Sequence, residues 1–140
     1  AVAVVVQKMV PSEVSGIAFT AHPVTKDKNV ILIEAIYGLG EAIVSGSVTP
    51  DCYIIDKSNF YVHDVEITTQ EKMLVKGLAG VEECLVPIAN RNQRKLTENK
   101  TIELAKLCKT IEEQYGMPQD IEWCLKGDEL FILQSRPITA

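Results

Sequence analysis

Short apolar runs separated by turn-forming residues fill the first half of the chain. Runs of this length, bounded by Pro, Ser, Gly, Lys and Asp residues, are typical of antiparallel strands. Two further strand-like pieces flank a turn at residues 76–80. The runs that predict strands cover residues 1–10, 16–21, 29–35, 52–56, 60–67, 72–75 and 83–88.

A helical pattern replaces the strand pattern after residue 96. Thr97 is a good N-cap, and Gly116 followed by Pro118 is a strong stop signal. Between them the apolar residues recur at helical spacing, which predicts a helix over Thr97–Tyr115 that packs through one face. The fold class expected is therefore α+β, an antiparallel sheet with one packed helix. The apolar positions are Leu104, Leu107, Cys108, Ile111 and Tyr115.

The segment from Asp120 to Arg136, DIEWCLKGDELFILQSR, predicts a β-hairpin that turns at Gly127. Its odd positions are mostly strongly apolar, so odd residues should face one common side and oppose each other. A three-residue loop over residues 127–129 satisfies this rule, whereas a two-residue turn would break it. Two polar pairs then follow, Glu122 opposite Gln134 and Asp120 opposite Arg136. The apolar odd positions are Ile121, Trp123, Leu125, Phe131 and Leu133.

Leu130 and Ile132 share the polar side of this hairpin, which nevertheless has the chemistry of a cation and phosphate site. Mg²⁺ prefers hard oxygen ligands, which Glu122 and the amide oxygen of Gln134 could supply. Arg136 offers a planar donor fork that matches phosphate and stays charged. The competing interpretation is a surface hairpin with an Asp120–Arg136 ion pair and a solvated Glu122. The pattern by itself leaves both interpretations open.

Composition and charge exclude several classes of protein. With 140 residues, 46% of them hydrophobic, the chain has the size of one domain. The net charge is −5, and no cluster of Lys and Arg is dense enough to predict nucleic-acid binding. The longest apolar run, Ala1–Val6, is far shorter than the roughly 20 residues of a membrane span. We therefore expect a cytoplasmic protein without a nucleic-acid or membrane partner.

Other candidate motifs carry little weight. Gly38, Leu39 and Gly40 begin a dinucleotide-binding pattern, but Ile43 stands where its third glycine belongs. His22 and His63 have no neighbouring nucleophile and are expected to be bystanders. The four cysteines are widely spaced, so they are expected to be ordinary reduced residues: Cys52, Cys84, Cys108 and Cys124.

Four segments, in order along the chain, resemble the nucleotide-binding region of one enzyme family. They are VVVQKMV, SGIAFTAHPVT, EAIYGLGEAIVSGSVTPDCY and YGMPQDIEWCLKGDELFILQSRPIT. The chain is similar over nearly all its length to the region shared by phosphoenolpyruvate synthase, pyruvate phosphate dikinase and rifampicin phosphotransferase. The resemblance implies that residues 1–140 form the second subdomain of an ATP-grasp fold, which clasps ATP between two α+β subdomains.

The resemblance also implies roles for individual residues. Glu122 and Gln134 would bind Mg²⁺, Arg136 would approach the terminal phosphates of ATP, and Asp120 would support them or lie beside the ribose. The segment Gly38–Glu41 would pack near the nucleotide without an assigned contact. The residues bordering the adenine, largely through backbone groups, would be Gln7, Lys8, Met9 and Val10.

In such enzymes ATP phosphorylates a histidine on a separate domain, which carries the phosphoryl group to an acceptor. The resemblance favours a phosphoenolpyruvate synthase, whose partners would be ATP, the first ATP-grasp subdomain, the phosphohistidine domain and the acceptor-binding domain. This chain without those parts is expected to be inactive. Two alternatives within the family are rifampicin phosphotransferase and pyruvate phosphate dikinase. Two further alternatives lie outside this family. One is an ATP-grasp ligase that makes an acyl phosphate, and the other is an acidic module that binds a ligand or protein without catalysis.

Overall fold

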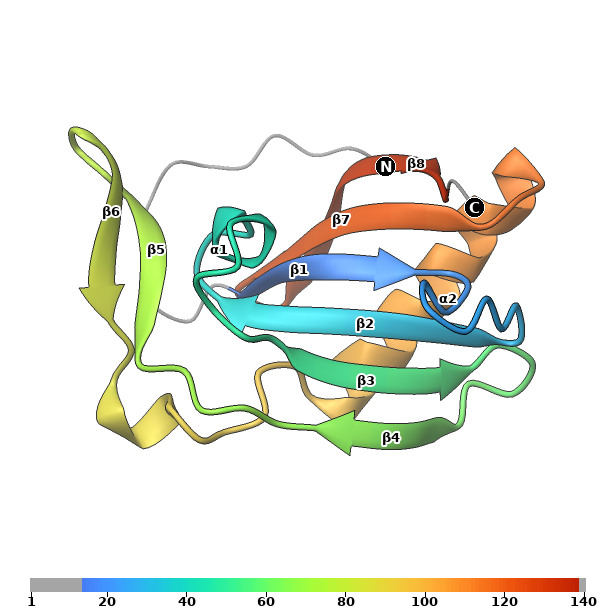
Figure 1. Cartoon of the computed structure of the whole chain (residues 1–140), viewed down its shortest axis with the longest axis horizontal. Coiled ribbons are helices and arrows are strands. Elements are labelled where there is room, and N and C mark those ends of the chain that lie inside the picture. The colour runs from blue at the N-terminus through green and yellow to red at the C-terminus, as the bar shows by residue number, and fades with distance from the viewer. Residues whose placement is uncertain (1–13, 139–140) are drawn as a thin grey trace.

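The computed structural model describes residues 14–138, and the apolar segment 1–10 lies outside this range. Its main feature is an antiparallel six-stranded sheet with the order β4-β3-β2-β1-β7-β8. Figure 1 shows the sheet in front of the long helix. The strands are β1 (Val14–Phe19), β2 (Val30–Tyr37), β3 (Asp51–Asp56), β4 (Val62–Glu66), β7 (Gln119–Lys126) and β8 (Glu129–Pro137). The α+β class with a mostly antiparallel sheet is confirmed.

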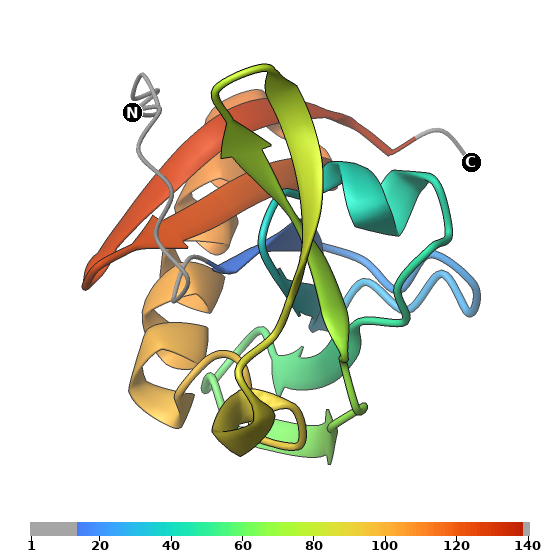
Figure 2. The same ribbon diagram turned by 90° about the vertical axis from the view of Figure 1, so that its left-hand side faces the viewer.

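A second, two-stranded sheet stands at one end of the main sheet. It consists of β5 (Lys72–Gly77) and β6 (Gly80–Leu85), which pair antiparallel. The turn expected at residues 76–80 is therefore shorter than predicted, because the strands run on to Gly77 and start again at Gly80. Figure 2 looks at this end and shows the hairpin standing beside α1 (Glu41–Val44). A short 3-10 helix, η1 (Ile88–Asn90), follows.

The long helix α2 (Glu98–Tyr115) has the caps that the sequence predicts. The Thr97 side chain accepts a hydrogen bond from the backbone N–H of Lys100 at 3.2 Å, and Gly116 closes the helix with φ 74°. Both features satisfy backbone groups that a helix end leaves unpaired. The prediction of a helix capped by Thr97 is confirmed. No helix within residues 14–138 is both long and apolar enough to cross a membrane.

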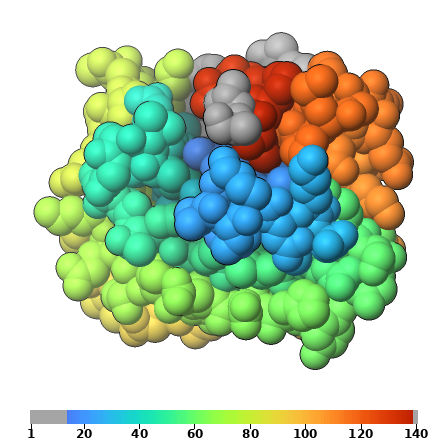
Figure 3. All heavy atoms as spheres, turned by 45° about the vertical axis from the view of Figure 1, so that its right-hand side comes forward, coloured from blue at the N-terminus to red at the C-terminus, as the bar shows by residue number. Residues whose placement is uncertain are grey.

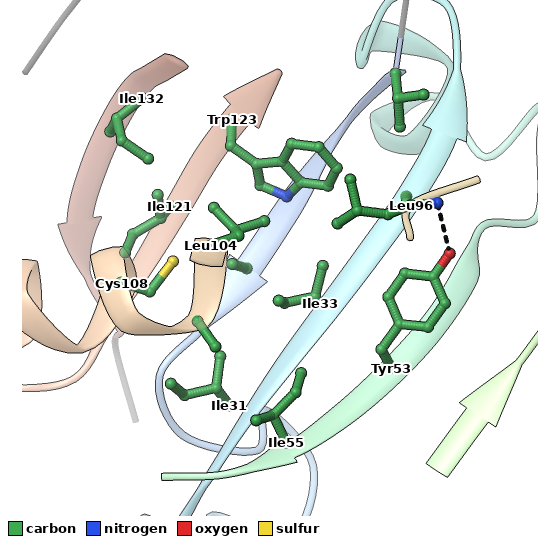
Figure 4. Close-up of a cluster of buried hydrophobic side chains, with 14 of the residues drawn as sticks. Ile31, Ile33, Tyr53, Ile55, Leu96, Leu104, Cys108, Ile121, Trp123 and Ile132 are labelled. Carbon is green, nitrogen blue, oxygen red and sulfur yellow. Dashed lines mark hydrogen bonds between the residues drawn. The ribbon is translucent and has the colours of Figure 1, made fainter. Parts of the chain in front are cut away.

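The core lies between α2 and one face of the main sheet. Leu104, Cys108 and Ile111 of the helix are buried there, and Leu107 packs at the margin. Figure 4 shows Leu104 and Cys108 facing the buried side chains of the strands. Burial of this apolar area is the main force that holds helix and sheet together. The buried side chains of the sheet include Ile31, Ile33, Tyr53, Ile55, Ile121, Trp123 and Ile132.

The packing around Trp123 requires a glycine in β1. Gly16 lies between Ala35 of β2 and Trp123 of β7 in the sheet. A Cβ atom at Gly16 would lie 1.8 Å from the carbonyl oxygen of Glu34 and 2.7 Å from the indole ring of Trp123. The close approach lets the indole cover the middle of the sheet, so the core is closed at this point without a side chain from β1.

A buried ion pair fastens the long connection between β4 and α2 to the sheet. Lys95 Nζ lies 2.6 Å from Asp51 Oδ1, and both side chains are fully buried. Asp51 also accepts hydrogen bonds from the backbone N–H groups of Thr68 and Lys95 at 3.0 Å and from the Tyr53 hydroxyl at 2.8 Å. Leu96 N in turn donates to Tyr53 Oη (Figure 4). One carboxylate thus ties both ends of the segment that carries β5 and β6.

Candidate functional site

The face of the sheet opposite α2 carries the polar residues of the predicted site. Successive side chains of a strand point to opposite faces. In β7, Ile121 and Trp123 point into the core, so Asp120 and Glu122 point to the opposite face. Figure 1 looks onto that face, which we call the open face.

The hairpin β7–β8 brings the predicted polar residues together as pairs. Glu122 lies opposite Gln134, and Asp120 lies opposite Arg136. Both predicted pairs are confirmed. Directly opposed residues in an antiparallel pair have Cβ atoms roughly 5 Å apart, close enough to share one ligand.

The prediction of a three-residue loop over residues 127–129 is wrong. Lys126 pairs with Glu129, which leaves a two-residue turn of Gly127 and Asp128, with Gly127 at φ 63°. The register shifts instead between Glu122 and Trp123, where Leu133 forms a β-bulge. A bulge inserts one unpaired residue and so reverses which residues of a strand face each side. The bulge restores the Glu122–Gln134 pair that a two-residue turn would otherwise break.

The bulge also corrects the predicted apolar side of the hairpin. Ile132 pairs with Trp123 and is buried in the core, and Leu130 pairs with Leu125 and packs against the core. Both had been expected on the polar side. Phe131 pairs with Cys124 and Leu133 lines the open face. The open face therefore offers a ligand both polar groups and an apolar wall.

The polar groups differ in how they are engaged. Arg136 Nε donates a hydrogen bond to Asp120 Oδ2 at 3.3 Å, and the arginine side chain is 68% exposed. The ion pair of the competing interpretation is therefore present. The Glu122 carboxylate and the Gln134 amide make no hydrogen bond or ion pair with any residue between 14 and 138. These two adjacent groups are available to a ligand.

Glu34 is a further carboxylate on the open face that sequence reasoning missed. Along one line across the sheet, Cys52 pairs with Glu34, Glu34 with Ile17, and Ile17 with Glu122. Burial, and then the negative charge of Asp120, raise the pKa of Glu34. The alternation of β2, which places Glu34 on the face opposite the buried Ile33, could have revealed it.

The pKa of the Cys52 thiol is raised in part by the same cluster of carboxylates. Its pKa rises to about 11, through burial first and then through the charges of Glu34, Glu66, Asp64 and Asp51. A like-charged neighbourhood disfavours a further anion and attracts cations. This half of the open face is therefore suited to a positively charged group.

A hollow of about 640 Å³ opens beside Glu122. Its apolar walls include Ile17, Leu39, Val44 and Leu133. In Figure 3 the surface is hollowed between the teal atoms of α1 and the red atoms of β8. An apolar hollow with a few polar groups at its rim is the usual form of a small-molecule site.

The glycine-rich corner forms one wall of this hollow. Gly38 has φ 84°, and a Cβ atom there would lie 2.4 Å from the carbonyl oxygen of Leu74, so the position requires glycine. The N–H of Leu39 donates to that same carbonyl at 2.8 Å. Leu39, Gly40 and Glu41 then line the hollow. The corner therefore joins the hairpin β5–β6 to the open face.

The remaining candidate residues lie elsewhere or outside the described range. His22 Nδ1 accepts hydrogen bonds from the N–H groups of Val24 and Thr25, and His63 lies 3.5 Å from Asp56. No disulfide bond joins the four cysteines, all of which lie in the described part of the chain. The residues expected to border adenine, Gln7–Val10, lie outside the described residues.

Comparison with known proteins identifies the family. Residues 1–140 match the family described as "Pyruvate phosphate dikinase, AMP/ATP-binding domain". A probable phosphoenolpyruvate synthase of Archaeoglobus fulgidus is 46% identical over 138 residues, and one of Pyrococcus horikoshii is 49% identical over 145 residues. The rifampicin phosphotransferase of Bacillus cereus is 43% identical over 138 residues.

These matches cover 99%, 96% and 99% of this chain, in the same order, but only 18%, 18% and 16% of the relatives. The chain thus spans less than a fifth of the length of these relatives. Relatives named phosphoenolpyruvate synthase and a relative named rifampicin phosphotransferase therefore share the region that this chain matches. The chain belongs to the family of pyruvate phosphate dikinase AMP/ATP-binding domains.

Proposed function

We propose that the open face holds Mg-ATP for transfer of a phosphoryl group to a carrier histidine elsewhere in a longer polypeptide. The observation that carries this proposal is the opposition of two unengaged oxygen ligands, Glu122 and Gln134, next to Arg136 and an apolar hollow. Phosphoryl transfer asks a protein mainly to position donors and cations around charged oxygens. The arrangement meets that requirement at one edge of a rigid sheet.

The donor set fits Mg²⁺. This ion commonly takes one or two protein oxygens and completes its octahedron with phosphate and water. Glu122 and the Gln134 amide oxygen would hold it, and the bound ion would neutralise the charge of the phosphates. The half-buried Glu34 adds to the negative field that favours a cation.

Arg136 remains able to bind phosphate although it contacts Asp120. The contact uses Nε, while the guanidinium carries five N–H donors in all. Asp120 therefore orients the arginine and leaves donors for a terminal phosphate. In this proposal Asp120 acts as a positioning residue, which also accounts for the observed ion pair.

The hollow is the place for the base and ribose. From Leu133 to Arg136 the strand advances roughly 10 Å, at about 3.3 Å per residue. That span separates the apolar wall from the residues proposed for the terminal phosphates. We place the base against Ile17 and Leu133, with Gln7–Val10 at its border, as the family resemblance implies.

In this proposal the chain is the second subdomain of an ATP-grasp fold. The first subdomain, the phosphohistidine domain and the acceptor domain belong to the rest of the polypeptide. The reaction is that of a phosphoenolpyruvate synthase, ATP + pyruvate + water giving phosphoenolpyruvate + AMP + phosphate. The two archaeal relatives with this name support this choice over the rifampicin phosphotransferase.

A labelling experiment tests this function. The whole polypeptide, incubated with Mg-ATP labelled in the β-phosphate, is expected to acquire an acid-labile phosphohistidine at a residue other than His22 or His63. Added pyruvate should discharge it as phosphoenolpyruvate. Mass spectrometry and scintillation counting follow both steps. A protein that stays unlabelled would contradict the proposal, and discharge to rifampicin alone would replace pyruvate by the antibiotic as acceptor.

The isolated chain is expected to bind Mg-ATP weakly and to turn over none of it. In this proposal ATP binds between two subdomains, so one subdomain alone lacks the hydrogen-bond donors of the other and does not fix the position of the nucleotide. Calorimetry on the chain, with circular dichroism to verify that it is folded, checks this. Micromolar or tighter binding would show that the site is complete within residues 1–140.

A further inference from the structure

The side chain of Gln70 takes the place of a neighbouring strand at the end of β2. The pairing of β2 with β3 runs only to Ala35 and Asp51, so it stops before Tyr37. At Tyr37 the Gln70 side chain, which is 2% exposed, continues the pairing. Its Oε1 accepts a hydrogen bond from Tyr37 N at 2.9 Å, and its Nε2 donates to Tyr37 O at 3.0 Å. One amide side chain thus satisfies both backbone polar groups of a residue that β3 does not reach.

Gln70 is itself fixed on the segment that leads into β5. Its Nε2 also donates to the carbonyl oxygen of Lys72 at 2.9 Å, and its backbone N–H donates to the carbonyl oxygen of Arg91 at 2.9 Å. The Tyr37 hydroxyl donates to the carbonyl oxygen of Asn90 at 3.0 Å. These bonds join the end of β2 to the chain on both sides of the hairpin β5–β6. The conformation of the Gln70 side chain is therefore set before a ligand binds.

The residues that follow Tyr37 form a wall of the hollow. Gly38 turns the chain with φ 84°, and Leu39 and Gly40 line the hollow. The carbonyl oxygen of Gly40 then accepts a hydrogen bond from the N–H of Ile43 at 3.0 Å, which closes the first turn of α1. The position of the Tyr37 backbone therefore decides the position of this whole wall. The further residues of the wall, in and directly after α1, are Glu41, Val44 and Ser45.

We propose that Gln70 is a positioning residue that sets the fit of the hollow to the nucleotide base. This inference rests on the proposed function, in which the base lies in the hollow and the phosphates lie at the polar pairs of β7–β8. Gln70 fixes the wall that contains Leu39 and Gly40, while Ile17 and Leu133 belong to the main sheet. A gap of about 0.5–1 Å in an apolar contact already loses about a quarter to a half of the dispersion attraction. A small displacement of the glycine-rich corner should therefore weaken the binding of the base.

This role predicts which ligands respond to a change at Gln70. ATP and adenosine both carry the base, whereas inorganic tripolyphosphate carries phosphates alone. Gln70 should therefore contribute equally to the binding of ATP and of adenosine, and nothing to the binding of tripolyphosphate. A residue that only stabilised the fold would change the affinities of all three ligands together, or of none while the protein stays folded.

Calorimetry on the whole polypeptide with Mg-ATP, adenosine and Mg-tripolyphosphate tests this role. Gln70→Met has a similar length but offers no amide to Tyr37, so both backbone groups lose their partner. The variant is expected to bind Mg-ATP and adenosine about 10-fold more weakly, an effect comparable with that of one methylene group in an apolar pocket. Mg-tripolyphosphate should bind as tightly as to wild type. Hydrogen exchange over residues 36–44, read by mass spectrometry, should accelerate because the corner is less firmly held.

Two further variants guard against a loss of folding. Gln70→Asn keeps the amide but is one methylene shorter, so it should hold Tyr37 less well and give a smaller effect of the same kind. Thr101→Val is the matched control, because it removes the hydrogen bonds of a fully buried hydroxyl to Thr97 and Arg94. Thr101 lies in α2, on the other face of the sheet, so its variant should bind all three ligands like wild type. Circular dichroism verifies that each variant is folded.

Two results would overturn the assignment. Unchanged adenosine affinity in the folded Gln70 variants would show that base binding does not depend on this side chain. An equal loss of tripolyphosphate affinity would show that the variants disturb the whole site rather than the hollow. The proposed function has a separate failure, in which Glu122→Ala binds Mg-tripolyphosphate as tightly as wild type. The phosphates would then lie elsewhere, whatever the Gln70 variants do to adenosine.

Discussion

Replacing Glu122 by alanine in the whole polypeptide is expected to lower ATP-dependent phosphorylation of the carrier histidine about 100-fold or more. The carboxylate is proposed to hold the ion that neutralises the phosphate charge during transfer, and loss of such electrostatic support typically has this magnitude. Single-turnover labelling at saturating Mg-ATP measures it. Glu122 is exposed and forms no hydrogen bond or ion pair within residues 14–138, so the variant should fold normally.

Variants of the opposite strand separate the roles within this site. Gln134→Ala should resemble Glu122→Ala but be milder, because a neutral amide oxygen contributes less to a cation than a carboxylate. Arg136→Lys keeps the charge but loses the planar fork and the Nε contact with Asp120, so a clear defect is expected. Glu113→Ala removes an exposed carboxylate from α2 and should be silent.

One combination of results would favour the competing interpretation. If Glu122→Ala and Arg136→Lys fold normally and keep near-wild-type phosphorylation, the hairpin is not the Mg-ATP site. The Asp120–Arg136 ion pair would then be a surface feature of little energetic value, as exposed ion pairs usually are.

Replacing Asp51 by alanine is expected to destabilise the chain by about 3–5 kcal/mol, the usual cost of breaking a buried ion pair. The change leaves the fully buried Lys95 charge without its carboxylate and removes the acceptor for the Thr68 N–H and the Tyr53 hydroxyl. Unpartnered buried donors add to the loss. Urea unfolding followed by circular dichroism measures the change in the free energy of unfolding.

A double-mutant cycle shows whether the pair itself is responsible. Lys95→Met in the Asp51→Ala background removes the orphaned charge, so the double variant should lose less stability than the sum of the single variants. The ion pair between Lys72 and Glu83 is a matched exposed control, with 3.7 Å between the charged groups and both side chains 60% exposed. Lys72→Met should therefore lower the free energy of unfolding by at most about 1 kcal/mol. A loss below about 1 kcal/mol for Asp51→Ala would show that water reaches Lys95.

The elements that the sequence predicts well are those whose signals are local. The helix α2 is recognisable because Thr97, Gly116 and the apolar spacing between them lie within one stretch of chain. The strands β1 to β4 follow from short apolar runs in the same way. Their bounds shift by a few residues, because pairing with a neighbouring strand decides where a strand ends.

In the hairpin β7–β8, the local sequence pattern predicts one feature correctly and misses another. Alternation predicts that Glu122 faces Gln134, and this pair is present, but the rule that odd residues oppose odd residues fails from Trp123 to Lys126. It does not predict the bulge at Leu133. Whether a two-residue turn with a bulge or a longer loop achieves that register depends on how Ile132 packs against the core, and the local pattern allows both.

The sequence by itself determined the α+β class, the capped helix, the polar pairs of the hairpin and, through resemblance, the family. Only the tertiary structure placed Glu34 on the same open face as Glu122 and brought the hairpin β5–β6 to the hollow. It alone paired Asp51 with Lys95, 44 positions apart in the chain. Such contacts depend on the order of strands in the sheet and on the docking of one sheet against another, and these are set by burial across the whole chain rather than by any local run of residues.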